Sequence, residues 1–162
     1  MANKQLAIYL NDHLAGATGA LELLTHLEET STGTAVGAAL TQLHVEIEGD
    51  RQELEHLMER LNIDVSVSRK VSGWLGEKLA YVKLQLDDTS DGSMRLFEGL
   101  EALALGIQGK RGLWQALAVV SACESELKHV QYDQLIQQAE DQHRRVEVLR
   151  LDAAKAVLAT TD

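Results

Sequence analysis

Apolar residues recur along this chain at every third or fourth position, which is the spacing of an amphipathic helix. This pattern predicts a first helix over residues 3–29 and, after the polar turn 30–34, a second helix ending near residue 62. A third long helix is expected over 93–118 and a fourth over 121–159. The pattern therefore predicts an all-α protein with four long helices.

The links between these helices differ in length. Short links force the first helix against the second and the third against the fourth, as antiparallel pairs. About 30 residues separate the second helix from the third, and they contain a shorter apolar stripe, over 68–84, and a loop, over 87–93. Such a connection can return the chain along the bundle, which is the ferritin-like order, whereas a plain up-and-down bundle does not need it. We predict one domain, 1–162, a ferritin-like antiparallel four-helix bundle with an extra helix in the long connection.

Two local features bear on the third and fourth helices. Ser121 and Glu124 have the spacing of a capping box, which predicts that the fourth helix begins at Ser121. The third helix contains Gly106, Gly109 and Gly112. These glycines indicate either a close approach of a neighbouring helix or a kink, and the sequence does not decide between the two.

Composition narrows the class of protein. The chain has no proline, 4% aromatic residues and a formal charge of −10, which would repel nucleic acid and anionic lipid. No apolar run approaches the roughly 20 residues that span a bilayer, and the N-terminus does not resemble a signal peptide. Its one cysteine fits a reducing compartment. We therefore expect a cytoplasmic protein that binds neither nucleic acid nor membranes.

The motif Glu-x-x-His occurs on both the second and the fourth helix, as Glu53 to His56 and as Glu140 to His143, and the third helix carries Glu98 and Glu101. In this order of helices and motifs the chain resembles the ferritin-like di-iron proteins, which place a glutamate on each of two helices and Glu-x-x-His on the other two. The resemblance implies handling of iron or of an oxidant. Mixed imidazole and carboxylate ligands suit iron, manganese or zinc.

Helical phase at 100° per residue tests each half of this motif. On the second helix Asp50 lies inside the apolar stripe, Glu53 lies at its edge, and His56 faces solvent. On the fourth helix His143 lies within the stripe and Glu140 beside it. The copy of the motif on the fourth helix therefore fits a buried site. The copy on the second helix does not, because its histidine faces solvent.

The first helix departs from the di-iron pattern, because the polar side chain on its inner stripe is His13, so the carboxylate expected there is missing or is replaced by histidine. Glu101 lies well off the main apolar stripe of the third helix. Counted from the predicted turns at 1.5 Å per residue, polar groups on all four helices share one layer roughly 25–30 Å from the turns. The candidate metal ligands are His13, Asp50, Glu53, Glu101, Glu140 and His143.

Three classes of function remain open on the sequence. The leading hypothesis is a non-catalytic or vestigial ferritin-like bundle, a homodimeric stress-related or interaction protein whose polar layer is a hydrogen-bonded network. The second is a metal-dependent oxidoreductase that uses the candidate ligands with iron or manganese. The third is a helical binding module that presents the region of Trp74 to a partner. No residue pattern fixes a reaction, so the sequence does not decide whether the protein is an enzyme.

Overall fold

The structure is a computed structural model that describes residues 3–66, 77 and 92–159. These residues form four long helices and one short 3₁₀ helix, and they include no strand: α1 Lys4–Thr30, α2 Ala35–Arg60, α4 Gly92–Val120, η1 Ser125–Leu127 and α5 Tyr132–Leu158. None of these helices combines the length and the apolar character that crossing a membrane requires. The all-α prediction is confirmed.

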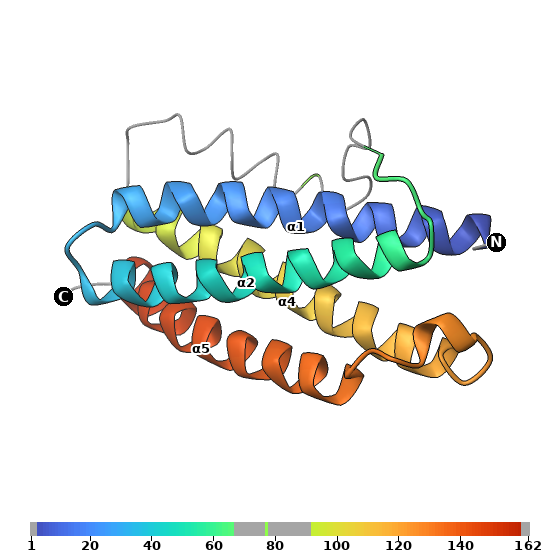
Figure 1. Cartoon of the computed structure of the whole chain (residues 1–162). Helices are drawn as coiled ribbons and strands as arrows, with labels where there is room; N and C mark the ends of the chain where they lie inside the picture. The colour runs from blue at the N-terminus through green and yellow to red at the C-terminus, as the bar shows by residue number, and fades with distance from the viewer. Residues whose placement is uncertain (1–2, 67–76, 78–91, 160–162) are drawn as a thin grey trace.

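The helices pack as two antiparallel pairs, α1 with α2 and α4 with α5, and α1 also contacts α4 (Figure 1). Helices α2 and α4 run in the same direction, so the end of α2 and the start of α4 lie at opposite ends of the bundle (Figure 1). This is the ferritin-like order, and it excludes the plain up-and-down alternative. The extra helix predicted over 68–84, with Trp74, lies outside the described residues except for Glu77.

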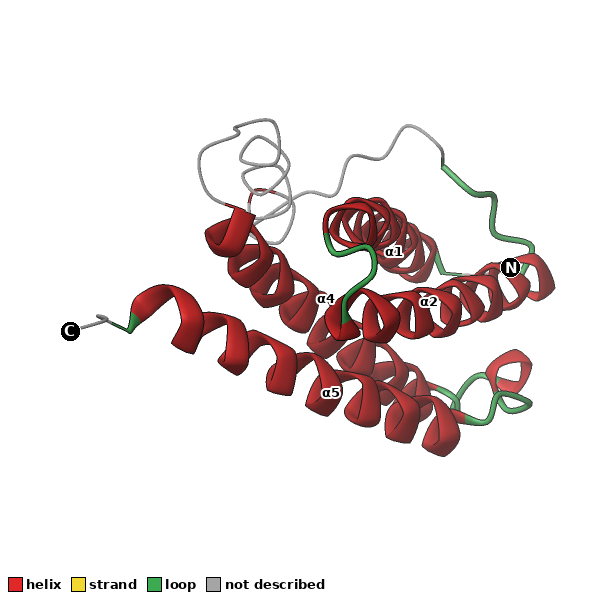
Figure 2. Ribbon diagram, turned by 90° about the vertical axis from the view of Figure 1, so that its left-hand side faces the viewer, coloured by secondary structure: helices red, strands yellow, loops and turns green. Residues whose placement is uncertain are grey.

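Two apolar clusters form the core (Figure 2 shows the four helices that enclose them). The first cluster lies toward the turn that joins α1 to α2, and its members include Leu23, Leu24, Leu27, Leu40, Leu43, Ile47, Leu100, Leu103 and Ile107. The second lies toward the other end and includes Leu10, Leu14, Leu54, Leu57, Met58, Leu113, Trp114 and Leu127. Asp50 of α2 and Lys110 of α4 fall between the two clusters in sequence, so the core is interrupted there by charged side chains.

The turn from α1 to α2 is held by side chains of its own sequence. Thr34 caps α2, because its hydroxyl oxygen accepts a hydrogen bond from the Gly37 amide at 3.0 Å. A Cβ atom at Gly37 would collide with the Ser31 carbonyl oxygen, so this close approach requires glycine. The short link thus forces α1 and α2 to pack side by side.

The predicted start of the last helix at Ser121 is wrong. Ser121 instead closes the end of α4, since its hydroxyl donates to the Ala118 carbonyl at 2.7 Å, and Glu124 is extended and exposed. Helix α5 begins only at Tyr132, whose hydroxyl donates to the Leu127 carbonyl at 3.0 Å. The capping pattern is local, whereas burial of Leu127 and Tyr132 in the second cluster fixes the connection.

The glycines of α4 differ in their surroundings. The helix continues through Gly106 and Gly109 without a break. At Gly99 a Cβ atom would lie 2.8 Å from Leu27 Cδ2, so α1 approaches closely there. At Gly106 and Gly109 a Cβ atom would meet nothing within 4 Å. Close approach therefore explains Gly99 but not the three later glycines, since a Cβ atom at Gly112 would also meet nothing within 4 Å.

Candidate functional site

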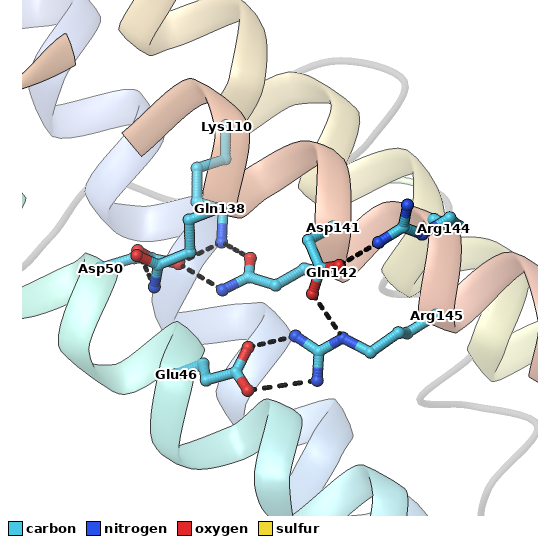
Figure 3. A network of polar contacts seen from close by, with 8 residues as sticks. All are labelled: Glu46, Asp50, Lys110, Gln138, Asp141, Gln142, Arg144 and Arg145. Carbon is cyan, nitrogen blue, oxygen red and sulfur yellow. Dashed lines mark hydrogen bonds and ion pairs between the residues drawn. The ribbon is translucent and has the colours of Figure 1, made fainter. Parts of the chain in front are cut away.

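Four polar side chains meet where α2, α4 and α5 pack, and we call them the polar cluster: Asp50, Lys110, Gln142 and, at its exposed edge, Gln138 (Figure 3). Asp50 is 4% exposed. Its Oδ2 accepts from Lys110 Nζ, in an ion pair, and from Gln142 Nε2 at 3.0 Å. Its Oδ1 accepts from Gln138 Nε2 at 3.2 Å. Both carboxylate oxygens are thus hydrogen-bonded, as burial of a charge requires.

Lys110 and Gln142 complete a closed triangle with Asp50. Lys110 Nζ donates to Gln142 Oε1 as well as to Asp50, and Gln142 is fully buried. Burial lowers the pKa of Lys110, because it removes water from the ammonium, and the Asp50 carboxylate opposes that shift. The amide of Gln142 serves both partners at once, as donor to the carboxylate and acceptor from the ammonium.

A second set of ion pairs extends from this cluster toward the surface between α2 and α5. The guanidinium of Arg145 binds both carboxylate oxygens of Glu46, with Nη1 donating at 3.1 Å, and its Nε lies 2.9 Å from Asp141 Oδ2 (Figure 3). Arg144 reaches Asp141 from the exposed side. The bidentate pair fixes the position of α5 along α2, because both partners are planar and directional.

Three of the four carboxylates predicted as metal ligands lie against cations of the chain itself. Asp50 pairs with Lys110, Glu140 Oε1 lies 3.0 Å from Arg111 Nε, and Glu101 Oε2 lies 3.9 Å from Arg150 Nη1. Glu53 is half-buried on α2. Within the described part of the chain, no three His, Cys, Asp or Glu side chains are grouped so that they could hold a metal ion. The six candidates therefore do not form one ligand cluster in this arrangement.

The two candidate histidines are both half-buried, in different surroundings. His13 packs edge-on against Tyr9, with ring centroids 4.6 Å apart, and burial lowers the pKa of His13 while Asp12 opposes the shift. His143 neighbours Glu147, whose pKa is lowered mainly by its hydrogen bond with Arg150 and to a lesser extent by His143. His56 is exposed, as predicted.

Sequence reasoning missed the role of Lys110 and Gln142. Gln142 is the fully buried polar residue of α5, whereas His143, one position later and predicted to lie within the apolar stripe, is half-buried. The signal was present, because Gln142 lies three residues after Ala139 and four before Val146, both of which are fully buried. Lys110 was harder to find, since α4 is apolar on several faces and its phase is poorly defined.

Beside the polar cluster lies a cavity of about 280 Å³ between α1, α2 and α4, which we call the central cavity. Asp50 and Lys110 form part of its wall, and His13 of α1 lies on it as well. The structure thus brings His13 and Asp50 of the predicted set to one cavity. The other wall residues are mainly small or apolar.

No family model matches this chain, and no curated protein matches it in sequence. Its fold is similar to that in the crystal structure of the E. coli stress protein YciF, with a TM-score of 0.69 and 12% sequence identity. The match covers 96% of this chain and 99% of that chain. At this identity the likeness shows the fold alone, and it supports the assignment of an all-α four-helix bundle.

Proposed function

We propose that this chain is a non-catalytic, stress-related member of the ferritin-like superfamily whose central layer is held by its own cations in place of a metal ion. The observation that carries the proposal is the position of Lys110, whose ammonium binds Asp50 and Gln142 where α2, α4 and α5 meet. A buried carboxylate needs a compensating positive charge, and Lys110 supplies it.

The neighbouring ion pairs support the same proposal. A metal ion bound by Glu140 or Glu101 would have to separate the first from Arg111 and the second from Arg150. Binding at Asp50 would strand the buried Lys110 ammonium beside a second cation, which is costly at short range in a poorly solvated site. The stress-related part of the proposal rests on the fold shared with the E. coli stress protein.

Elemental analysis of untagged protein, purified without chelators, tests the proposal. We expect far less than one metal ion per chain, and no consumption of oxygen or peroxide after titration with ferrous iron. In cells that carry the native gene, quantitative mass spectrometry should show that the protein becomes more abundant under oxidative stress.

Stoichiometric metal together with turnover of oxygen or peroxide would support the oxidoreductase hypothesis instead. In that case His13→Ala and His143→Ala would each abolish metal uptake, and His56→Ala, at an exposed position, is the matched control. Retention of metal in both His13→Ala and His143→Ala would rule out the predicted ligand set.

We further propose that the protein is a cytoplasmic homodimer. The C-terminal half of α5 supports a dimer, because Val148, Leu151 and Leu158 are 57%, 55% and 61% exposed and lie within about 80° of one another around the helix. Light scattering should give twice the mass of one chain, and Leu151→Glu should halve it. Val45→Glu, at an exposed position of α2, is the control. A monomeric wild-type protein would contradict this proposal.

A further inference from the structure

The central cavity is bordered by glycine on two of its three helices. Gly16 of α1 and Gly106 of α4 both line it, and a Cβ atom at either would meet nothing within 4 Å. Glycine inside a helix destabilises it relative to alanine. At Gly99 the close contact with Leu27 accounts for the glycine, whereas at Gly106 no side chain of the described part of the chain fills the space. The two helices therefore leave room for a bound molecule.

The size and the lining of the central cavity suit one small ring. At about 280 Å³ it is roughly twice the ~150 Å³ apolar cavity that holds benzene in an engineered protein. Most of its wall is apolar and comes from Ile47, Leu54, Leu103, Ile107 and Leu113. A molecule with one ring and a short substituent would fill the space with apolar contacts.

The charged side chains on the wall balance one another. Two are acidic, Asp12 and Asp50, and two are basic, Arg51 and Lys110, so their formal charges sum to zero. Lys110 is paired with Asp50, and the guanidinium of Arg51 forms ion pairs with two glutamates of α2. A ligand of either charge would meet side chains of its own sign and would also lose its hydration. The wall therefore favours a neutral molecule.

His13 places a polar group on this wall that the described part of the chain does not satisfy. Its ring packs edge-on against Tyr9, and neither ring nitrogen forms a hydrogen bond with a described residue. Unlike Trp114 Nε1, neither nitrogen is fully buried, so a bound molecule can reach the imidazole. Burial lowers the pKa of His13, so at pH 8 the imidazole is neutral and has one donor and one acceptor nitrogen.

A hydroxyl group matches a neutral imidazole in either orientation. It can donate a hydrogen bond to the acceptor nitrogen of His13 or accept one from the donor nitrogen, whereas a carbonyl oxygen can only accept. A hydroxyl is also uncharged, as the balanced charges of the wall require. These two properties together indicate an alcohol.

We infer that the central cavity is a binding site for a small, neutral, mostly apolar alcohol, whose hydroxyl group forms a hydrogen bond with the imidazole of His13. The apolar part of the ligand occupies the space beside Gly16 and Gly106. The inference goes beyond the proposed function, because the site requires no metal and no reaction.

Four small molecules with the same ring test the inference: benzyl alcohol, ethylbenzene, benzylamine and benzoate. Titration of the full-length protein at pH 8, followed by calorimetry, should show one saturable site for benzyl alcohol. Protonated benzylamine and benzoate should each bind more weakly, because each must leave water and meet a side chain of its own sign. The imidazole resonances of His13, identified among those of six histidines by their loss in His13→Phe, should move when benzyl alcohol binds.

The variant His13→Phe tests the hydrogen bond, because it keeps an aromatic ring beside Tyr9 and removes both nitrogens. Ethylbenzene carries a methyl group in place of the hydroxyl group of benzyl alcohol, so the ratio of the two affinities isolates the hydroxyl. This ratio, alcohol over hydrocarbon, should be about three- to tenfold lower in His13→Phe than in the wild type, as expected for one hydrogen bond. His56→Phe, at an exposed position outside the cavity wall, is the matched control and should keep the wild-type ratio.

Two glycine variants locate the apolar part of the site. Gly106→Leu should abolish binding of both benzyl alcohol and ethylbenzene, because its side chain fills the cavity. It should keep the helical circular dichroism of the wild type, since leucine is the better helix former. Gly112→Leu is the matched control on the same helix, at an exposed position outside the cavity wall, and it should bind both molecules as the wild type does.

Three results would overturn the inference: no saturable binding of benzyl alcohol, equal binding by the wild type and Gly106→Leu, or an affinity ratio that His13→Phe leaves unchanged. Tighter binding of benzylamine or benzoate than of benzyl alcohol would overturn the assignment of a neutral ligand. Elemental analysis of the same samples separates this result from the proposed function, because metal content and ligand affinity are measured independently.

Discussion

The two apolar clusters and the polar cluster between them hold the same helices together by different physical means. In the apolar clusters, leucines such as Leu40 and Leu57 are fully buried and pack without directional contacts. In the polar cluster, Asp50 and Gln142 are equally buried but contact specific donors and acceptors. The comparison suggests that the apolar clusters supply most of the free energy of folding, while the polar cluster sets which residues of α2, α4 and α5 face one another.

Apolar burial and a buried ion pair are expected to contribute differently to the free energy of folding. Full burial of one leucine contributes about 1.5–3 kcal/mol. A buried ion pair contributes little on balance, because desolvation of both charges offsets their attraction, yet removal of one partner costs about 3–5 kcal/mol. The pair of Asp50 and Lys110 should therefore be almost neutral as a unit and expensive to break.

The largest effect is expected from Lys110→Met. It leaves the Asp50 carboxylate buried at 4% exposure without a compensating cation, so the free energy of unfolding should fall by about 3–5 kcal/mol. Denaturant unfolding monitored by circular dichroism measures the change.

The triple variant Asp50→Leu/Lys110→Met/Gln142→Leu sharpens the comparison. It removes every charge and amide of the closed triangle, so its stability should return to within about 1 kcal/mol of the wild type or exceed it. Arg144→Met, at a pair that is largely exposed, is the control and should change stability by less than about 1 kcal/mol. A single variant Lys110→Met as stable as the control would contradict the role given to the polar cluster.

A smaller effect is expected from the titration of His13, which packs against Tyr9 at the edge of the same layer. Burial lowers the pKa of His13 below its ordinary value of about 6.5. As the pH falls below about 6.5, the unfolded chain therefore takes up a proton before the folded chain does, and the free energy of unfolding decreases until the folded pKa is passed. His13→Gln should make the stability curve flatter over this interval.

The exposed His56 provides the control for that measurement. His56→Gln should keep the slope of the wild type between pH 7 and pH 5, as measured by denaturant midpoints at each pH. A wild-type slope in the His13→Gln variant would mean that burial of His13 does not contribute to the acid sensitivity of the fold.

The sequence predicted the four helices, their order and the burial of Asp50, because the apolar period and the lengths of the links are local properties of the chain. It also placed His56 in solvent correctly. It misplaced the start of α5, since the pattern at Ser121 and Glu124 gave a local signal for a capping box that the burial of Leu127 overrides. The extra helix over 68–84 lies outside the described residues and stays a prediction.

What the sequence by itself determined is the class of fold and the place of Asp50 on the inner stripe of α2. Only the tertiary structure decided which polar side chains meet: Lys110 and Gln142 with Asp50, and Arg111 with Glu140. The physical reason is that periodicity fixes the face of one helix at a time. The pairing of a carboxylate depends on the rotation and offset of two helices, and a difference of one residue rotates a side chain by about 100°.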